Sequence, residues 1–122
     1  MLDMKIVSLQ VTGAENKKNP YLQIEVADSF FRRFLGLMGR KRIANGTGLL
    51  IAPCNSIHMC FMRFKIDVVY LDKNYRVLKT VENILPWIGL SCCFKAWAVL
   101  ELPAGEIKRQ GIGKDMVFRP VD

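Results

Sequence analysis

Apolar and polar residues alternate in short segments along most of this chain, and this pattern predicts a series of β-strands. Several of the segments are rich in β-branched and aromatic residues, which favour strands. The strand-like segments are residues 4–13, 21–27, 49–51, 57–64, 66–71, 77–81, 97–102 and 116–119. Many short strands separated by turns predict a mainly β fold, either a small β-sandwich or a partly closed β-barrel.

One segment has helical rather than strand spacing. Apolar residues between Phe30 and Met38 recur every three or four positions behind Asp28, a residue type that caps helix N-termini, and Gly39 is placed to end the helix. The sequence therefore predicts one short α-helix near residues 29–38. The 122 residues, of which 51% are hydrophobic, fit a single domain over residues 1–122 with a hydrophobic core.

No segment of the sequence is typical of a transmembrane helix or of a signal peptide. The charge-free stretch 43–62 contains glycine, proline, asparagine and histidine, and the stretch 83–94 is too short to span a bilayer. The first ten residues lack a long apolar run. We therefore expect a soluble cytoplasmic protein, exported only if a leader has been removed.

The chain is basic, with 18 Lys and Arg against 11 Asp and Glu and a formal net charge of +7. This charge suits an anionic partner such as nucleic acid or an acidic surface. The cations that cluster, and that would contact such a partner, are Arg32, Arg33, Arg40, Lys41 and Arg42. The simpler interpretation is a solvated helix end, where cations are favoured. Nucleic acid is not the favoured partner, because no basic ladder interleaved with aromatic residues is present.

The segment 56–71 carries the strongest candidate site. It places the only histidine, His58, with Arg63 and Asp67 in an apolar run, where polar groups need partners or a function. Trp87, in a loop, and Glu101, in an apolar strand, are further candidates. The structural interpretation of Asp67 is an ion pair or a capping carboxylate; the functional one is a carboxylate that acts with His58. Two carboxylates in one pocket would indicate hydrolysis.

The four cysteines are too few for a disulfide scaffold, and we expect them to be reduced. Cys54, His58, Cys92 and Cys93 are of the types that bind zinc. Their spacing matches no standard zinc motif, so apolar thiols without a cofactor are the first expectation and a zinc site is the alternative.

Two main hypotheses follow from these residues. The leading one is a non-enzymatic ligand-binding or accessory module whose pocket is formed around His58, Arg63 and Asp67. The rival is a hydrolase-like enzyme, or a thiol- or zinc-dependent one, that uses His58 with Asp67 or a cysteine. A third hypothesis is docking of the basic clusters on nucleic acid or an acidic partner. The sequence leaves open whether the chain is an enzyme.

Three blocks in this order resemble one prokaryotic family, the "domain of unknown function 192" group. They are RRFLGLMGR (32–40), FMRFKIDVVYLDKNYRV (61–77) and VLELPAGEIKRQGIGKDM (99–116). The residues that fall on the family's motif positions are Arg33, Gly36, Leu37, Met38, Arg40, Met62, Asp67, Leu102, Pro103, Gly105 and Asp115. The resemblance implies a mainly β domain of sandwich or barrel type with one short helix, and it implies no established reaction.

Overall fold

The computed structural model describes residues 5–11, 22–27 and 40–121, which contain nine strands and one short helix. The strands are β1 (Lys5–Val11), β2 (Leu22–Ala27), β3 (Thr47–Ile51), β4 (Ser56–His58), β5 (Ile66–Leu71), β6 (Val77–Ile84), β7 (Leu90–Cys92), β8 (Ala98–Pro103) and β9 (Phe118–Pro120), and the helix is α2 (Glu106–Gln110). No helix in these ranges is long and apolar enough to cross a membrane.

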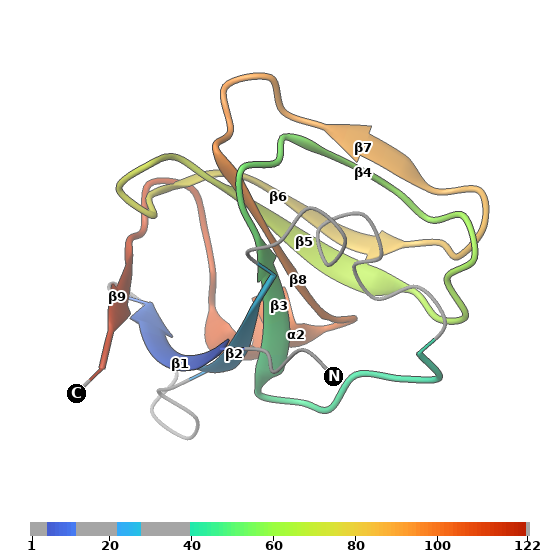
Figure 1. The fold of residues 1–122 in the computed structure, drawn as a ribbon, viewed down its shortest axis with the longest axis horizontal. Helices are drawn as coiled ribbons and strands as arrows, with labels where there is room; N and C mark the ends of the chain where they lie inside the picture. The colour runs from blue at the N-terminus through green and yellow to red at the C-terminus, as the bar shows by residue number, and fades with distance from the viewer. Residues whose placement is uncertain (1–4, 12–21, 28–39, 122) are drawn as a thin grey trace.

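Seven strands form one curled sheet in the order β6-β5-β8-β3-β2-β1-β9, and β4 and β7 form a separate two-stranded ribbon (Figure 1). Neighbouring strands are antiparallel except for β2 and β3, which are parallel. The two edges of the sheet approach each other at one end, where Arg76 and Val117 form a bridge and the amide of Phe118 donates to the carbonyl of Tyr75 over 2.9 Å. The sheet is therefore a half-barrel closed at one end.

The sheet is buried on both faces at its centre. All six residues of β5 and all six of β8 are buried, as expected for strands covered on both sides. One core cluster includes Leu9, Val77 and Phe118 from both sides of the curl, so it fills the inside of the half-barrel. The second, which includes Ile57 of β4 and Tyr70 of β5, lies between the sheet and the β4–β7 ribbon.

The predicted fold class is confirmed, since the chain is mainly β and its sheet forms a half-barrel. The helix expected near residues 29–38 lies outside the described residues. Helix α2 was not predicted. The strand expected over 57–64 was wrong beyond His58, because residues 59–62 form a turn. Ribbon strand β7 was also missed, because three residues are too few to show an alternation.

Candidate functional site

Asp67, one of the candidate site residues, is fully buried and accepts three backbone hydrogen bonds. Its Oδ1 accepts from the amide of Asn83 over 2.9 Å, and its Oδ2 accepts from the amides of Gly105 and Ile107 over 3.0 and 3.1 Å. The carboxylate thus ties β5 to the end of β6 and to the start of α2. This geometry corresponds to the capping role, since a buried carboxylate is stabilised when amides surround it.

Arg63, in contrast, is exposed and lies in the segment between the 59–62 turn and β5. In the described ranges the ion pairs are Arg40–Glu25 and Arg109–Glu106, so Asp67 and Arg63 are not brought together as a pair. His58 is also exposed, on β4, where it lies opposite Leu90 of β7. His58 and Arg63 are therefore surface groups, while Asp67 is a buried group that joins elements of the structure.

Glu101 of β8 is the second buried carboxyl in the sheet, with 6% of its surface exposed. Within the described part of the chain its Oε1 has no hydrogen-bond partner. Burial raises the pKa of Glu101 to about 7, an effect that the Arg40 guanidinium partly offsets. Glu101 lies opposite Val68 in the β5–β8 ladder, so it shares the face of Val68, whereas Asp67 points to the other face. The two carboxyl groups therefore do not share one pocket.

The buried carboxylate of Glu106 in α2 was missed by the sequence analysis. Its Oε1 accepts from the amide of Gly46 over 2.8 Å and from Nη2 of Arg109 over 3.2 Å, and its Oε2 accepts from Nε2 of Gln110 over 3.1 Å. These bonds join the helix to the turn before β3. A glutamate that follows glycine in a short polar segment gives no sequence signal of burial, so it could not have been found.

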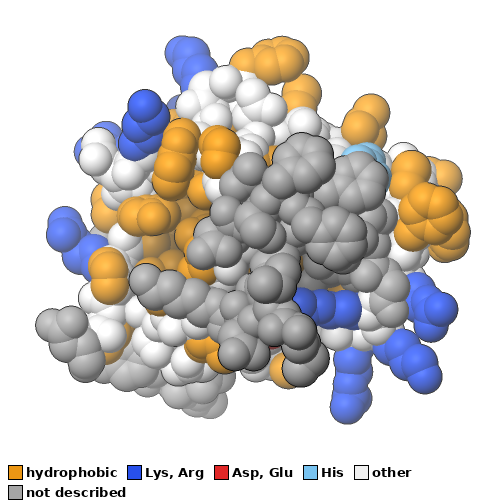
Figure 2. Space-filling view, in the orientation of Figure 1, with side chains coloured by type: hydrophobic (Ala, Val, Ile, Leu, Met, Phe, Trp, Pro, Cys, Tyr) orange, Lys and Arg blue, Asp and Glu red, His pale blue; other side chains and the backbone are white. Residues whose placement is uncertain are grey.

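The outer face of the β4–β7 ribbon and its end turns carries most of the exposed apolar surface. Seven large hydrophobic side chains are exposed in the described residues, and all except Ile6 lie between positions 61 and 94. We call this group the ribbon surface; its members are Phe61, Leu85, Trp87, Ile88, Leu90 and Phe94. Leu90 and Phe94 are 80% and 86% exposed. Figure 2 shows hydrophobic side chains along the upper and right edges of the view, where the ribbon lies.

Two turns at one end of the ribbon are held together by backbone hydrogen bonds. The amide of Trp87 donates to the carbonyl of Met59 over 2.7 Å, and the amide of Met59 donates to the carbonyl of Gly89 over 2.9 Å. Gly89 is required for this close approach, because a Cβ there would lie 2.5 Å from the carbonyl oxygen of Leu85 and 2.7 Å from Cγ of Met59. The turns containing Phe61 and Trp87 therefore form one rigid tip.

The aromatic residues of this tip have unusual backbone angles. Phe61 and Trp87 have φ angles of 65° and 69°, in the left-handed region that bulky residues avoid. Their rings meet edge-to-face, with centroids 5.2 Å apart, yet they stay 63% and 57% exposed. A strained backbone of this kind costs about 1 kcal/mol or more per residue. Full burial of the rings does not offset this strain here, because both rings stay largely exposed. The tip is therefore a candidate binding element.

Basic side chains lie close in sequence to the ribbon surface or contact the ribbon. Arg63 and Lys65 follow the tip in sequence, Lys95 follows Phe94, and Nζ of Lys79 donates to the carbonyl of Cys92 over 3.0 Å. All four are exposed. The surface thus combines apolar side chains with cations, a composition suited to an amphiphilic, negatively charged ligand.

The cysteines lie in and beside the ribbon. None of the four, all within the described residues, forms a disulfide, and Cys60 and Cys92 are exposed. Burial raises the pKa of Tyr70 to about 12, Ser91 partly offsets this effect, and the neighbouring Cys54, Cys92 and Cys93 add smaller raising contributions. In the described part of the chain no three His, Cys, Asp or Glu side chains form a group that could hold a metal ion, so Cys54, His58, Cys92 and Cys93 are not assembled as one.

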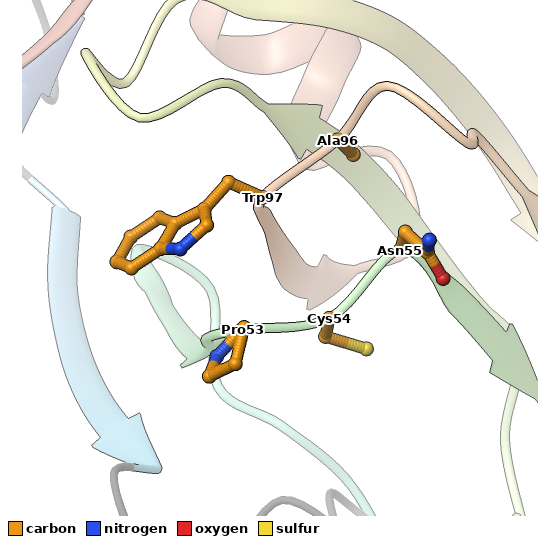
Figure 3. Close-up of a pocket in the computed structure, with 5 residues that line it drawn as sticks. All are labelled: Pro53, Cys54, Asn55, Ala96 and Trp97. Carbon is orange, nitrogen blue, oxygen red and sulfur yellow. The ribbon is translucent and has the colours of Figure 1, made fainter.

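A hollow of about 240 Å³ lies at the other end of the ribbon, beside Cys54. It is lined by Pro53, Cys54, Asn55, Ala96 and Trp97. Figure 3 shows the Trp97 and Pro53 rings on one side of it, with the thiol of Cys54 directed away from them. That thiol donates to the carbonyl of Ser56 over 3.1 Å. The hollow is open to solvent.

The basic clusters are divided in the structure. Arg40 forms an ion pair of 2.8 Å with Glu25 and is half-buried. Lys41 and Arg42 are exposed. Arg32 and Arg33 lie outside the described residues. The described cations of this group therefore do not form one patch of free charge, because Arg40 is already paired.

The sequence matches a known family over most of its length. The pattern of DUF192, a family described as uncharacterised, matches residues 11–119. A UPF0127 protein of Pyrococcus horikoshii is 38% identical over 89 residues, a match that covers 68% of this chain and 74% of that protein. A UPF0127 protein of Thermococcus kodakarensis is 39% identical over 93 residues, covering 70% of this chain but 57% of the relative.

Two crystal structures share the fold. A candidate transcription regulator of Sinorhizobium meliloti is similar with a TM-score of 0.87 at 20% identity, covering 98% of this chain and 97% of that one. A protein of unknown function from Novosphingobium aromaticivorans has a TM-score of 0.77 at 22% identity, covering 93% and 84%. At these identities the likeness concerns the fold alone. From the match over residues 11–119 and the archaeal relatives, this chain belongs to the uncharacterised DUF192 family.

Proposed function

We propose that this chain is a non-enzymatic accessory module that binds an amphiphilic, anionic ligand through the ribbon surface. The observation that carries the proposal is the tip formed by Phe61 and Trp87. Two aromatic side chains sit on strained, mutually hydrogen-bonded turns and remain more than half exposed. Strain of this kind persists where the surrounding structure enforces it, and it is concentrated at binding sites.

The three residues first considered for a pocket have different roles in this proposal. His58 and Arg63 lie on the binding side, where Arg63 attracts the anionic group of the ligand. Asp67 is a positioning residue, because its Oδ1 fixes the amide of Asn83 two residues before the turn that carries Trp87. Glu101 lies on the sheet below the ribbon and does not contact the ligand.

The enzyme alternative receives less support from the geometry. Asp67 is occupied by three amides and lies away from His58, and the cysteines do not assemble with His58 around a metal. One observation favours catalysis: the buried Oε1 of Glu101 has no hydrogen-bond partner among the described residues, and its carboxyl group has a raised pKa. If Glu101 were a general acid, its replacement by glutamine would abolish turnover and leave ligand binding intact.

Tryptophan fluorescence tests the binding proposal with a simple probe. Trp97→Phe leaves Trp87 as the only indole, and Trp87→Phe leaves the half-buried Trp97 as a matched control. Dodecyl phosphate below its micelle concentration carries one apolar chain and one anionic group. We expect it to shift the Trp87 emission to the blue and to leave the Trp97 emission unchanged, and dodecyl maltoside to act more weakly. Equal responses of both indoles, or none, would contradict the proposal.

A further inference from the structure

We infer that the ribbon surface docks on an anionic lipid bilayer. This inference rests on the proposed function and names its partner, a membrane surface rather than a soluble amphiphile. Three features of the described residues support it: the placement of the apolar side chains, the sign of the surrounding charge, and the chemistry of the tip.

The apolar side chains sit on the turns and strands that form the outermost layer of the molecule. Phe61 and Trp87 lie on the tip, Leu90 on β7 and Phe94 in the segment that leads from β7 to β8. In Figure 1 this layer is the upper part of the view, away from the closed end of the half-barrel. Exposed apolar side chains on an outer layer can enter the boundary between head groups and acyl chains.

The charge around this face is complementary to an anionic membrane. Arg63, Lys65, Lys79 and Lys95 are exposed, and of the acidic side chains between residues 54 and 97 Glu82 is exposed, Asp72 partly exposed and Asp67 buried. Cations close to a bilayer that contains anionic lipids are attracted within a Debye length of it. The same charges argue against a second copy of this chain as the occupant, since two basic rims would face each other.

The chemistry of the tip also suits the lipid interface. Tryptophan combines a large apolar ring with one hydrogen-bond donor, and it is enriched where membranes meet water. The backbone of the turns that carry Trp87 and Phe61 is joined by the Trp87–Met59 and Met59–Gly89 hydrogen bonds. Little side-chain and loop entropy is then lost on insertion, which favours binding by preorganisation.

Sedimentation with vesicles tests the inference directly. We expect the wild-type chain to bind vesicles of phosphatidylcholine with phosphatidylglycerol, and to bind pure phosphatidylcholine vesicles far more weakly. The variant Phe61→Ser with Trp87→Ser should bind the anionic vesicles at least about tenfold more weakly, because two rings no longer leave water. Ile6→Ser is the matched control, since Ile6 is equally exposed, at 63%, on β1.

Charge-reversal variants test the electrostatic contribution to vesicle binding. Arg63→Glu with Lys65→Glu should weaken binding to the anionic vesicles and make it less sensitive to salt. Lys73→Glu, in the turn between β5 and β6, is the control and should have a smaller effect. Quenching of Trp87 by brominated lipid acyl chains, measured in Trp97→Phe, supplies a readout that does not depend on the folding of any surface variant.

The outcomes distinguish a failure of the membrane inference from a failure of the proposed ligand binding. If anionic vesicles fail to bind while dodecyl phosphate still shifts Trp87, the membrane inference is overturned and the ligand-binding module stands. If neither probe acts on Trp87, both are overturned. A third outcome is that Phe61→Ser with Trp87→Ser binds vesicles as well as wild type, while Trp87 in Trp97→Phe is not quenched. Docking would then occur through another surface, and the inference would also be overturned.

Discussion

The buried part of the molecule and the ribbon surface differ in which groups they bury and which they expose. Carboxyl groups are buried on both faces of the sheet. Asp67 and Glu106 accept backbone and side-chain hydrogen bonds. Glu101, on the face under the ribbon, has an Oε1 without a hydrogen-bond partner among the described residues. The ribbon surface exposes aromatic and aliphatic side chains that could have formed core.

Burial and hydrogen bonding therefore distinguish structural from functional residues better than residue type does. A buried carboxylate surrounded by amides is explained by the stability of the fold, so Asp67 needs no ligand. Exposed phenylalanine and tryptophan on a strained backbone are not explained by stability, because burial would be favourable and the backbone angles are costly. The polar residues therefore hold the structure, and the apolar surface is the candidate for function.

The largest effect is expected at Asp67. Asp67→Ala removes the acceptor of three backbone amides, those of Asn83, Gly105 and Ile107. We expect a loss of about 4 kcal/mol in the free energy of unfolding, since buried donors would lack partners. Chemical denaturation measures it. Asp72→Ala, which removes the acceptor of two amides in an exposed turn, should cost about 1 kcal/mol. Equal losses for the two variants would contradict the capping role of Asp67.

The Glu101 carboxyl should make stability depend on pH. Its pKa is about 7 in the folded protein against 4.5 when solvated, so the folded state holds the proton more tightly. The contribution of Glu101 to stability is then full below about pH 4.5 and is lost as the pH rises through about 7, by about 3 kcal/mol in all.

Glu101→Gln is the matched variant for this effect. It should remove that slope and unfold with a free energy about 3 kcal/mol higher than wild type at pH 8, compared with little difference at pH 4. Denaturation curves at the two pH values measure it. A wild-type slope that survives in Glu101→Gln would show that another group causes it.

A smaller effect is expected at Gly89, which allows the two turns of the tip to meet. Gly89→Ala would place a methyl group against Met59 and the carbonyl of Leu85, at a cost of about 2 kcal/mol. It should also reduce the response of Trp87 to dodecyl phosphate, because the tip is displaced. Gly46→Ala is a useful control, since a Cβ there meets no atom within 4 Å although its φ is 78°. A Trp87 response unchanged in Gly89→Ala would contradict the rigid tip.

The smallest effects on stability are expected on the ribbon surface itself. Ile88→Ser and Leu90→Ser replace side chains that are 79% and 80% exposed, so we expect changes within about 0.5 kcal/mol. Their binding to anionic vesicles should nevertheless decrease. If these variants lose stability but still bind vesicles, the ribbon surface has a structural role and not a binding role.

The sequence predicted the sheet well because its signal is local. Alternation marked β1, β2 and β6, and the mostly apolar sequences of β5 and β8, interrupted by Asp67 and Glu101, follow from burial on both faces. It also placed Asp67 in a buried environment that needed partners. Those partners, at Asn83, Gly105 and Ile107, come from distant parts of the chain, and no periodicity indicates which backbone amides fold onto a carboxylate.

The candidate site was harder to predict for the same reason. Phe61 and Met62 look like strand residues in sequence. They lie in a turn closed by the Met62–Met59 hydrogen bond, next to the long-range Met59–Gly89 bond, and local periodicity does not reveal such a turn. Trp87 was singled out as a loop tryptophan, but its pairing with Phe61 required the fold. The ribbon strand β7 has three residues, which is below what alternation can reveal.

The most direct measurement of this account is the unfolding free energy of Phe61→Gly with Trp87→Gly, taken with its vesicle binding. Glycine accepts the φ angles of 65° and 69° without strain, and the lost rings were largely exposed. We predict a change in stability below about 1 kcal/mol and loss of binding to anionic vesicles. A loss of about 3 kcal/mol or more, with binding retained, would show that the rings are core and would contradict the account.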